Sequence, residues 1–440
     1  MDKKFTYYDR ETECMPRKAI EDLQNESLVR QVKYVYDNVV PYRQKMIDAK
    51  IRPADIKSTK DLYKLPFNDK RDLRDNYPFG LMAVKRGDLA RIHASSGTTG
   101  KLTVAGYTKK DLDIWGELMA RCLVNAGATG ESMIHVAYGY GLFTGGLGVH
   151  IGAEKLGAAV VPASSGNTAR QIMLIMDLQA DLLACTPSYA AYIADEMKRM
   201  GISPADIPLR TGVFGAEPWT EGMRQNLERG LGIEAFDIYG LSEIMGPSVS
   251  IDCPIHNGLH VWEDHFIAEI VDPKTLEPIE ENGKTGELVF TTLTKEGMPL
   301  IRYRTKDLCS IDRAPCACGR THARMGKIVG RSDDMLIIRG INVFPSQIET
   351  VLLNIREAAP HYQILVDRVN NLDTLEIQVE LSEELFSDTV KGIESVKKKL
   401  EKEMTAMLGI APIIRLAEPR SLPRSEGKAK RVVDKRLFDK

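Results

Sequence analysis

From about residue 88 onward, short apolar runs alternate with longer amphipathic segments along the chain. Apolar runs bounded by turn residues predict buried strands, and here they fall at 133–138, 158–163, 181–185, 211–214 and 235–239. Strands that alternate with helical segments predict an α/β fold with a mostly parallel sheet. Ligands of such sheets lie beyond the carboxyl ends of the strands, so the turns after these strands are the expected site.

The segments between the strands begin with residues that cap helices. Thr108 with Asp111 matches a capping pair, Thr186 precedes Pro187 as a cap followed by proline, and Thr220 opens a third segment. Each start predicts a helix that carries the chain from one strand to the next.

The pattern changes twice toward the C-terminus. After residue 260 the chain is richer in strand-like runs, at 266–271, 287–293 and 300–303. After the GRSDD segment we expect a compact unit of strands and helices at 334–339, 345–353, 363–366, 375–380 and 387–407. We therefore predict a large N-terminal domain over 1–332 and a small α+β domain over 333–440.

Composition narrows the class of protein. The 440 residues are 43% hydrophobic and 27% charged, as expected for a globular protein of two or three domains. A net charge of −2 gives no field that would attract nucleic acid or an anionic membrane. The polar start has no secretory apolar region, and no run approaches about 18 apolar residues, so we expect a cytoplasmic protein. Seven cysteines then predict thiols or metal ligands rather than disulfides.

Residues 95–103 read S-S-G-T-T-G-K-L-T and concentrate phosphate-binding chemistry. Glycines let backbone N–H groups approach a polyphosphate, hydroxyls donate to its oxygens, and a lysine adds positive charge. The spacing is not that of a Walker A loop, because Leu102 follows the lysine. The alternative is a flexible polar turn. The candidate phosphate ligands are Ser95, Ser96, Gly97, Thr98, Thr99, Gly100 and Lys101.

Two further motifs follow predicted strand ends, G-A-E-P from residue 215 and Y-G-L-S-E from residue 239. Small residues leave room for a flat base, an aromatic ring can stack on it, and a glutamate can bind Mg²⁺. Each motif alone also fits a tight turn with a surface acid. The candidate nucleotide ligands are Gly215, Ala216, Glu217, Pro218, Asp237, Ile238, Tyr239, Gly240 and Ser242, with Glu243 for Mg²⁺. Asp307 is a candidate acceptor for ribose hydroxyls, or else part of a charged edge strand.

A third motif, Y-G-Y-G-L-F-T-G-G at 138–146, combines aromatic rings with glycines that leave space. It predicts an apolar pocket for an aryl ring, although ordinary core packing is the alternative. The candidate pocket residues are Tyr138, Phe143, Ala216, Ile238 and Pro247.

Cysteines and histidines recur in two separate segments, C-P-I-H-N-G-L-H from residue 253 and C-A-C from residue 316. Three thiolates and one imidazole meet the ligand count of a structural zinc site, although free thiols are the alternative. Three histidines compete for the fourth position, and the slack of the intervening chain favours His260 over His256 and His322. The predicted zinc ligands are Cys253, His260, Cys316 and Cys318.

Taken in order along the chain, these motifs resemble the acyl-adenylate-forming superfamily of acyl-CoA synthetases, adenylation domains and luciferases. Y-G-L-S-E resembles the superfamily motif Y-G-x-T-E, with Ser242 in place of threonine. GRSDDMLIIRG at 330–340 resembles its hinge motif with Asp333 at the pivot, and R-S-E-G-K ending at Lys428 resembles its last motif. Longer stretches at 262–266, 290–295, 301–307 and 333–346 resemble the phenylacetate–CoA ligases more narrowly.

The resemblance implies ATP-dependent ligation of phenylacetate, or a close arylacetic acid, to coenzyme A through an acyl-adenylate, with release of AMP and diphosphate. It implies a role in phenylacetate catabolism, a homodimer, and domain closure that brings Lys428 to the substrate carboxylate and the α-phosphate. The alternatives are adenylation of another aromatic acid, loading of a carrier-protein thiol, or a nucleotide-sensing protein that kept the fold. The remaining implied roles are β/γ-phosphate binding by Thr98, Thr99 and Lys101, Mg²⁺ binding by Glu243, and ribose binding by Asp307 assisted by Arg331.

Overall fold

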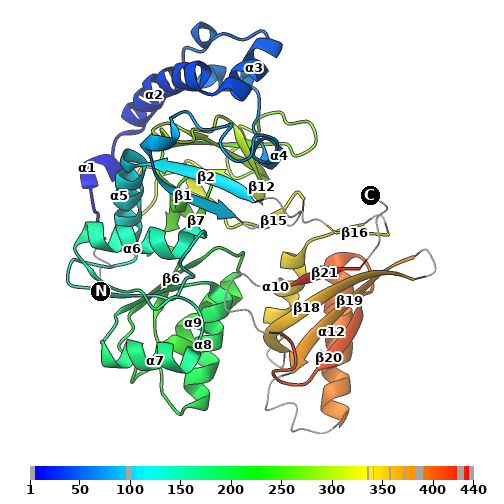
Figure 1. The fold of residues 1–440 in the computed structure, drawn as a ribbon. Helices are drawn as coiled ribbons and strands as arrows, with labels where there is room; N and C mark the ends of the chain where they lie inside the picture. The colour runs from blue at the N-terminus through cyan, green and yellow to red at the C-terminus, as the bar shows by residue number, and fades with distance from the viewer. Residues whose placement is uncertain are drawn as a thin grey trace.

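The computed structural model describes residues 5–95, 102–333, 336–339, 341–355, 358–369, 372–381, 390–423 and 431–435. Its central feature is a nine-stranded sheet (Figure 1). In spatial order the strands are β13 (Ile311–Asp312), β14 (Arg324–Met325), β9 (Leu259–Val261), β8 (Gly246–Asp252), β7 (Glu234–Leu241), β6 (Thr211–Gly215), β5 (Leu182–Cys185), β3 (Met133–Val136) and β4 (Ala159–Val161). The strands from β7 to β4 pair in parallel, and those from β7 to β13 pair antiparallel.

Helices cover both faces of the parallel half, which explains why β5 is apolar along its whole length. On β5, Leu182 and Ala184 belong to one buried cluster, whereas Leu183 and Cys185 belong to another. Side chains alternate between the faces of a strand, so a strand buried on both faces reads as a continuous apolar run. The covering helices are α5 (Lys109–Asn125) and α6 (Thr144–Leu156) on one face, and α7 (Thr168–Asp177), α8 (Pro187–Arg199) and α9 (Glu221–Leu231) on the other (Figure 1).

The predicted helix starts are confirmed by hydrogen bonds. The side chains of Thr108, Thr186 and Thr220 each cap a helix by accepting from a backbone N–H in its first turn. Thr108 and Asp111 form a reciprocal capping box, which satisfies two donors that the helix itself leaves unpaired. These capping threonines set where the helices begin, and thereby set the length of the turns between strand and helix.

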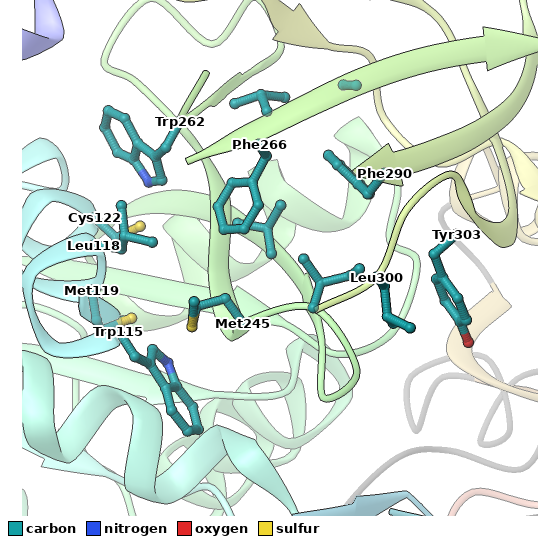
Figure 2. Packing of buried hydrophobic residues seen from close by; sticks show 14 of the residues in the cluster. Trp115, Leu118, Met119, Cys122, Met245, Trp262, Phe266, Phe290, Leu300 and Tyr303 are labelled. Carbon is teal, nitrogen blue, oxygen red and sulfur yellow. The ribbon is translucent and has the colours of Figure 1, made fainter. Parts of the chain in front are cut away.

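A four-stranded antiparallel sheet, in the order β10-β11-β12-β15, packs beside the large sheet. Figure 2 shows Phe266, Phe290 and Leu300 of this region in one buried cluster with Trp115 of α5 and with Met245. The strands are β10 (Phe266–Val271), β11 (Gly286–Thr292), β12 (Tyr303–Cys309) and β15 (Gly330–Arg331). The two sheets and α5 therefore share one core.

The predicted strand at 300–303 is wrong except for its last residue, where β12 begins. Leu300 instead bonds back to Thr292, donating its N–H to the hydroxyl oxygen at 2.9 Å. Arg302 has a positive φ of 45°, which an extended strand cannot contain. Apolar residues fill this segment because it is buried, and burial of a loop produces the same sequence pattern as burial of a strand.

The remaining elements of the large part lie at its N-terminal end. A hairpin of β1 (Leu89–Ser95) and β2 (Thr103–Thr108) flanks residues 96–101. The helices are α1 (Arg10–Glu13), α2 (Arg17–Asn38), α3 (Val40–Asp48) and α4 (Lys70–Asp75), with single 3₁₀ turns at Pro53–Asp55, Thr59–Lys64 and Arg86–Asp88. None of the helices described here combines the length and apolar character needed to cross a membrane.

The C-terminal part has a hydrophobic core of its own, centred on Ile364, Ile377 and Leu400. Its four-stranded sheet has the order β20-β19-β18-β21, and it stands apart from the large sheet in Figure 1. The elements are β16 (Leu336–Ile338), β17 (Ile341–Val343), α10 (Pro345–Leu353), β18 (Ala358–Val369), β19 (Leu372–Leu381), α12 (Val390–Leu408), β20 (Ile413–Ala417) and β21 (Val432–Asp434). The α+β character agrees with the prediction, while the boundary at 332/333 stays a prediction.

Candidate functional site

The carboxyl ends of β6 and β7 lie side by side, and their backbones approach closely. A Cβ added at Gly215 would lie 2.1 Å from the carbonyl oxygen of Ile238. The next residue, Ala216, has φ +70°, a left-handed conformation that is strained for a residue with a Cβ. Strain of this kind persists where the surroundings fix the backbone, and it is common in ligand-binding turns. The G-A-E-P motif therefore forms a defined turn at the sheet edge where a ligand is expected.

A chain of hydrogen bonds leads from β7 to the start of the C-terminal part. Tyr239 donates its hydroxyl to Oδ2 of Asp307 at 2.6 Å. Arg331 binds the other oxygen of Asp307 at 2.7 Å and also forms two bonds to Asp333, at 2.9 and 3.1 Å. The predicted ribose acceptor and the predicted hinge residue are thus joined through one guanidinium.

Glu243 lies in the turn after β7 and is 5% exposed. One carboxylate oxygen is 3.4 Å from the hydroxyl of Tyr303. Within the described ranges, no lysine or arginine forms an ion pair with this carboxylate. A buried carboxylate without a cationic partner is costly unless a cation binds it, so the residue fits the chemistry of a Mg²⁺ ligand.

The other residues of the two motifs have assigned contacts. Ser242 is buried, and its hydroxyl lies 3.1 Å from that of Thr144. Gly240 has no room for a side chain, because a Cβ would lie 1.7 Å from the carbonyl oxygen of Gly246. Glu217 accepts the backbone N–H of Ser188 at 2.7 Å, at the first turn of α8. Glu217 therefore fixes a helix start as well as belonging to the motif.

Asp237, another predicted ligand, is an acid within β7 itself. Burial raises its pKa to about 7, with a further increase from the charge of Asp252 against an opposing effect of Lys327. A carboxyl group with a raised pKa, in a strand that borders the expected site, is a candidate for contact with a ligand.

The predicted pocket residues gather at one end of the sheet. Tyr138 is 3% exposed, and its ring centroid lies 6.4 Å from that of Phe143, which is 42% exposed. Ile238 is buried, and Pro247 lies against α6, where a Cβ at Gly148 would be 2.8 Å from its ring. The two aromatic rings thus span from the protein interior to the surface.

The four predicted metal ligands come together although they derive from two distant segments. One ligand atom from each of Cys253, His260, Cys316 and Cys318 lies within 4.8 Å of all the others, and all four residues are buried. Nε2 of His260 lies 3.3 Å from Sγ of Cys318, while Nδ1 lies 3.2 Å from the carbonyl oxygen of His322. A carbonyl contact on one ring nitrogen leaves the other for a metal.

The competing histidines point elsewhere. Nδ1 of His256 lies 2.6 Å from Oδ2 of Asp252, and its Nε2 lies 3.4 Å from Glu234. Both ring nitrogens of His322 have partners outside the cluster, the N–H of Glu263 and the carbonyl of Thr12. The fold therefore brings His260, and neither of the other two, to the three thiols.

Several predicted ligands lie outside the described residues, namely Ser96, Gly97, Thr98, Thr99, Gly100, Lys101 and Lys428. Ser95, at the end of β1, is described. Its buried hydroxyl has no hydrogen-bond partner among the residues that the structure describes. A buried unpaired hydroxyl at this place is compatible with a polar ligand nearby.

Lys295 and Tyr107 contact the turn that carries Glu243, and neither is among the site residues predicted from the sequence. The ammonium of Lys295 donates to the carbonyl oxygens of Glu243 and Ile244, both at 2.8 Å. Tyr107 donates its hydroxyl to the carbonyl of Ser242. The available signal was a single lysine inside the otherwise uncharged run 288–295, which reads as a strand end from sequence alone.

Comparison with known proteins identifies the class. The profile of the AMP-binding enzymes matches residues 12–293, and that of the AMP-binding enzyme C-terminal domain matches residues 340–436. The phenylacetate-coenzyme A ligase of Thermus thermophilus is 51% identical over 443 residues, covering 98% of this chain and 99% of the relative. The chain thus belongs to the AMP-binding enzymes and, within them, to the phenylacetate-coenzyme A ligase family.

Two solved structures of one other ligase are similar to this chain at different levels. A 2-hydroxyisobutyryl-CoA ligase in the postadenylation state, in complex with R3-HIB-AMP, superimposes with a TM-score of 0.92 at 26% identity, covering 99% of this chain and 93% of that one. The same ligase with 2-HIB-AMP and CoA, in the thioesterification state, gives 0.73 at 27% identity, covering 98% and 92%. Coverage and identity are nearly equal, so the higher TM-score shows that the present structure is more similar to the postadenylation structure than to the thioesterification structure.

Proposed function

We propose that this chain ligates phenylacetate, or a close arylacetic acid, to coenzyme A at the expense of ATP. The observation that carries the proposal is 51% identity over 98% of the chain to a phenylacetate-coenzyme A ligase. The superposition on a ligase that holds an acyl-AMP supports the same reaction class.

The chemistry explains why two steps are needed. A carboxylate is a poor acyl donor because its leaving group would be oxide. An oxygen of the carboxylate attacks the α-phosphorus of ATP, the bond to diphosphate breaks, and a mixed anhydride with AMP forms. The sulfur of coenzyme A then attacks the acyl carbon, the thiol proton goes to solvent, and AMP leaves with its electron pair. Such reactions depend on positioning and charge neutralisation more than on covalent help.

Different residues of this chain are proposed to bind different parts of ATP. Asp307, held by Tyr239 and Arg331, is the proposed acceptor for the ribose hydroxyls. Glu243 would hold Mg²⁺, which offsets negative charge on the phosphates when bound. Residues 95–101 would contact the β- and γ-phosphates. The turn Gly215–Pro218 with Asp237, Ile238 and Gly240 would border the base.

The acid would lie between the aromatic pair and the apolar wall. In this proposal Tyr138, which is buried, would form the inner end of the pocket, and Phe143, which is 42% exposed, would form the outer end. Ala216, Ile238 and Pro247 complete the wall. Lys428 would approach the substrate carboxylate and the α-phosphate, where two negative groups otherwise repel each other.

We infer that the present arrangement corresponds to the state that follows the first step, because it is more similar to the postadenylation structure of that ligase than to its thioesterification structure. The small part contacts the large part through Leu353, which packs against the cluster under α8 and α9, and through His361, 3.4 Å from Asp195. Asp333 is the proposed pivot for the second arrangement, in which coenzyme A reaches the adenylate. A homodimer, a cytoplasmic location and a boundary between residues 332 and 333 remain parts of this proposal that rest on the resemblance and on composition.

Two coupled assays test the function. Phenylacetate-dependent exchange of labelled diphosphate into ATP reports the first step, and loss of the free thiol of coenzyme A reports the second. We expect both with phenylacetate and with a subset of arylacetic acids. Exchange without thiol loss would favour transfer to a carrier protein, and no exchange with any aromatic acid would refute the proposal.

We also propose that Cys253, His260, Cys316 and Cys318 bind a structural zinc ion. Four buried ligand atoms within 4.8 Å of one another match the tetrahedral sites of zinc, and four protein ligands leave no open position for catalysis. The carbonyl of Cys318 accepts the hydroxyl of Tyr7 at 2.6 Å, and Arg320 forms a buried ion pair with Glu13 at 2.7 Å. The ion would therefore stabilise the attachment of the N-terminal segment to the large domain.

Elemental analysis of protein purified without added metal tests the zinc site. We expect about one zinc per chain, lost in Cys316→Ser and kept in Cys309→Ser, a buried cysteine outside the cluster. Less than about 0.2 zinc per chain in the unmodified protein would refute the site. If Cys316→Ser retains its zinc, the metal binds at a different site.

A further inference from the structure

Lys295 is a fully buried lysine whose charge is compensated in an unusual way. It is 0% exposed, and the described residues place no carboxylate in an ion pair with its ammonium. Its donors reach two backbone carbonyls, of Glu243 and Ile244, at 2.8 Å each, while the ring centroid of Tyr107 lies 4.3 Å away. Two carbonyl dipoles and an aromatic face thus stabilise the charge.

The segment that carries Lys295 is itself held firmly. Gln31 of α2 donates to the carbonyl of Lys295 at 2.8 Å. The buried carboxylate of Asp111 accepts the next two backbone N–H groups, of Glu296 at 2.7 Å and Gly297 at 2.8 Å. The ammonium therefore projects from a fixed backbone, so it can fix a second segment in turn.

We propose that Lys295 is a positioning residue, which holds the backbone of Glu243 and Ile244 so that the carboxylate of Glu243 is presented to a divalent cation bound with the nucleotide. The inference rests on the proposed function, in which Glu243 binds that cation. The choice of carbonyls as acceptors matters, because an ammonium paired with the carboxylate itself would neutralise it and compete with the cation. Lys295 fixes the turn and leaves the carboxylate available.

The charge of Lys295 persists under ordinary conditions. Burial lowers its pKa to about 8, against the opposing fields of Asp111 and Glu243. At pH 7 the group is mainly the ammonium, which donates to both carbonyls. A neutral amine would keep fewer and weaker donors to the two carbonyls.

The test uses Lys295→Met, which keeps the length of the side chain and removes its charge and donors. The matched control is Lys110→Met, because Lys110 contacts the same segment through Glu296 at 2.6 Å but is 63% exposed. Lys295→Gln, which retains an amide donor, serves if the methionine variant does not fold. Tyr107→Phe tests the neighbouring contact, since it removes the donor to Ser242 and keeps the ring.

The first readout needs neither substrate nor activity. Amide hydrogen exchange of residues 241–246 is expected to accelerate about tenfold in Lys295→Met and to stay unchanged in Lys110→Met, with little change elsewhere. Tyr107→Phe should produce a smaller acceleration in the same segment. Exchange that accelerates throughout the chain, or not at all in this segment, would overturn the inference, because it would show a role in general packing.

The second readout is metal affinity. Electron paramagnetic resonance of Mn²⁺, titrated into protein saturated with a non-hydrolysable ATP analogue, measures the cation site directly. We expect about tenfold weaker Mn²⁺ binding in Lys295→Met with analogue affinity in the absence of metal changed less than about twofold. Equal Mn²⁺ affinity in Lys295→Met and unmodified protein would overturn the positioning role alone. Failure of the unmodified protein to bind Mn²⁺ with the analogue would instead count against the proposed function of Glu243.

Discussion

The hydroxyl of Tyr239 donates a 2.6 Å hydrogen bond to the carboxylate of Asp307, joining the large sheet to the four-stranded one across a sequence separation of 68 residues. Arg331 binds the second oxygen of the same carboxylate at 2.7 Å. Asp307 is therefore oriented from two sides before any nucleotide binds, which reduces the entropy lost on binding. This arrangement leads to the first prediction.

Asp307→Asn is expected to raise the half-saturating concentration of ATP by about tenfold or more, because an amide replaces an acceptor-only group with one that also donates. Tyr239→Phe should raise it less, since the carboxylate keeps its arginine partner. Diphosphate exchange at varied ATP measures both. Lys284→Ala, which removes an exposed ion pair with Glu281 in the same domain, is the control. An unchanged ATP dependence in Asp307→Asn would contradict the ribose role.

Lys428→Ala is expected to separate the two half-reactions. Without the lysine, the acid carboxylate and the α-phosphate repel each other, so diphosphate exchange should fall by about a hundredfold or more. Thioester formation from chemically prepared phenylacetyl-adenylate should remain, because that step needs no approach of two anions. Equal loss of both activities would show that Lys428 acts through folding or domain position.

The contacts of His256 with Asp252 and Glu234 should make the free energy of unfolding depend on pH. Burial alone would lower the pKa of His256, but the hydrogen bonds that its ring donates to the carboxylates of Asp252 and Glu234 outweigh burial and raise the pKa to about 9, above the ordinary 6.5. The folded state then binds more protons than the unfolded state between these values. The stabilisation is therefore complete below about pH 6.5 and lost as the pH rises through about 9.

His256→Gln removes the charged imidazole and tests whether the stabilisation is lost as the pH rises. We expect the variant to be less stable than the unmodified protein by about 1–2 kcal/mol at pH 6, with the difference vanishing above about pH 9. Denaturant unfolding at several pH values measures the difference. A destabilisation that is constant with pH would indicate lost packing against Phe236, whose ring centroid lies 5.4 Å away, rather than lost charge.

Two glycines provide a matched test of backbone crowding. An added Cβ at Gly240 would lie 1.7 Å from the carbonyl oxygen of Gly246, whereas one at Gly87 meets nothing within 4 Å. Gly240→Ala should lower the free energy of unfolding by about 2–4 kcal/mol, and Gly87→Ala should change it by less than about 0.5 kcal/mol. Thermal and denaturant unfolding report both. Similar effects of the two substitutions would mean that β7 and β8 relax freely around residue 240.

Local chemistry in the sequence predicted much of this protein. The strand at 211–214 is predicted because a strand buried on both faces is continuously apolar, and β6 has that environment. β7 is only partly buried, and Asp237 interrupts its apolar run. Thr108, Thr186 and Thr220 marked helix starts because capping involves residues within one turn. The segment 300–303 was misassigned for a related reason, since burial of a loop and burial of a strand select the same side chains.

The metal cluster was predictable from the sequence, whereas the role of Lys295 was not. The cysteines at 253, 316 and 318 could be predicted to lie close together, because three thiols and a histidine are the ligands of a structural zinc site. Lys295 could not be assigned, since nothing near it in the chain indicates that its ammonium meets the carbonyls of Glu243 and Ile244, 52 and 51 residues away.

The sequence by itself determined the elements, the motifs and the family, because these depend on residue types at short spacing. Only the tertiary structure decided that His260 rather than His256 faces the thiols, that Arg331 joins Asp307 to Asp333, and that a buried lysine supports the turn of Glu243. Each of these depends on the path of the chain between distant segments. That path is set by the packing of whole sheets and helices, which no local pattern specifies.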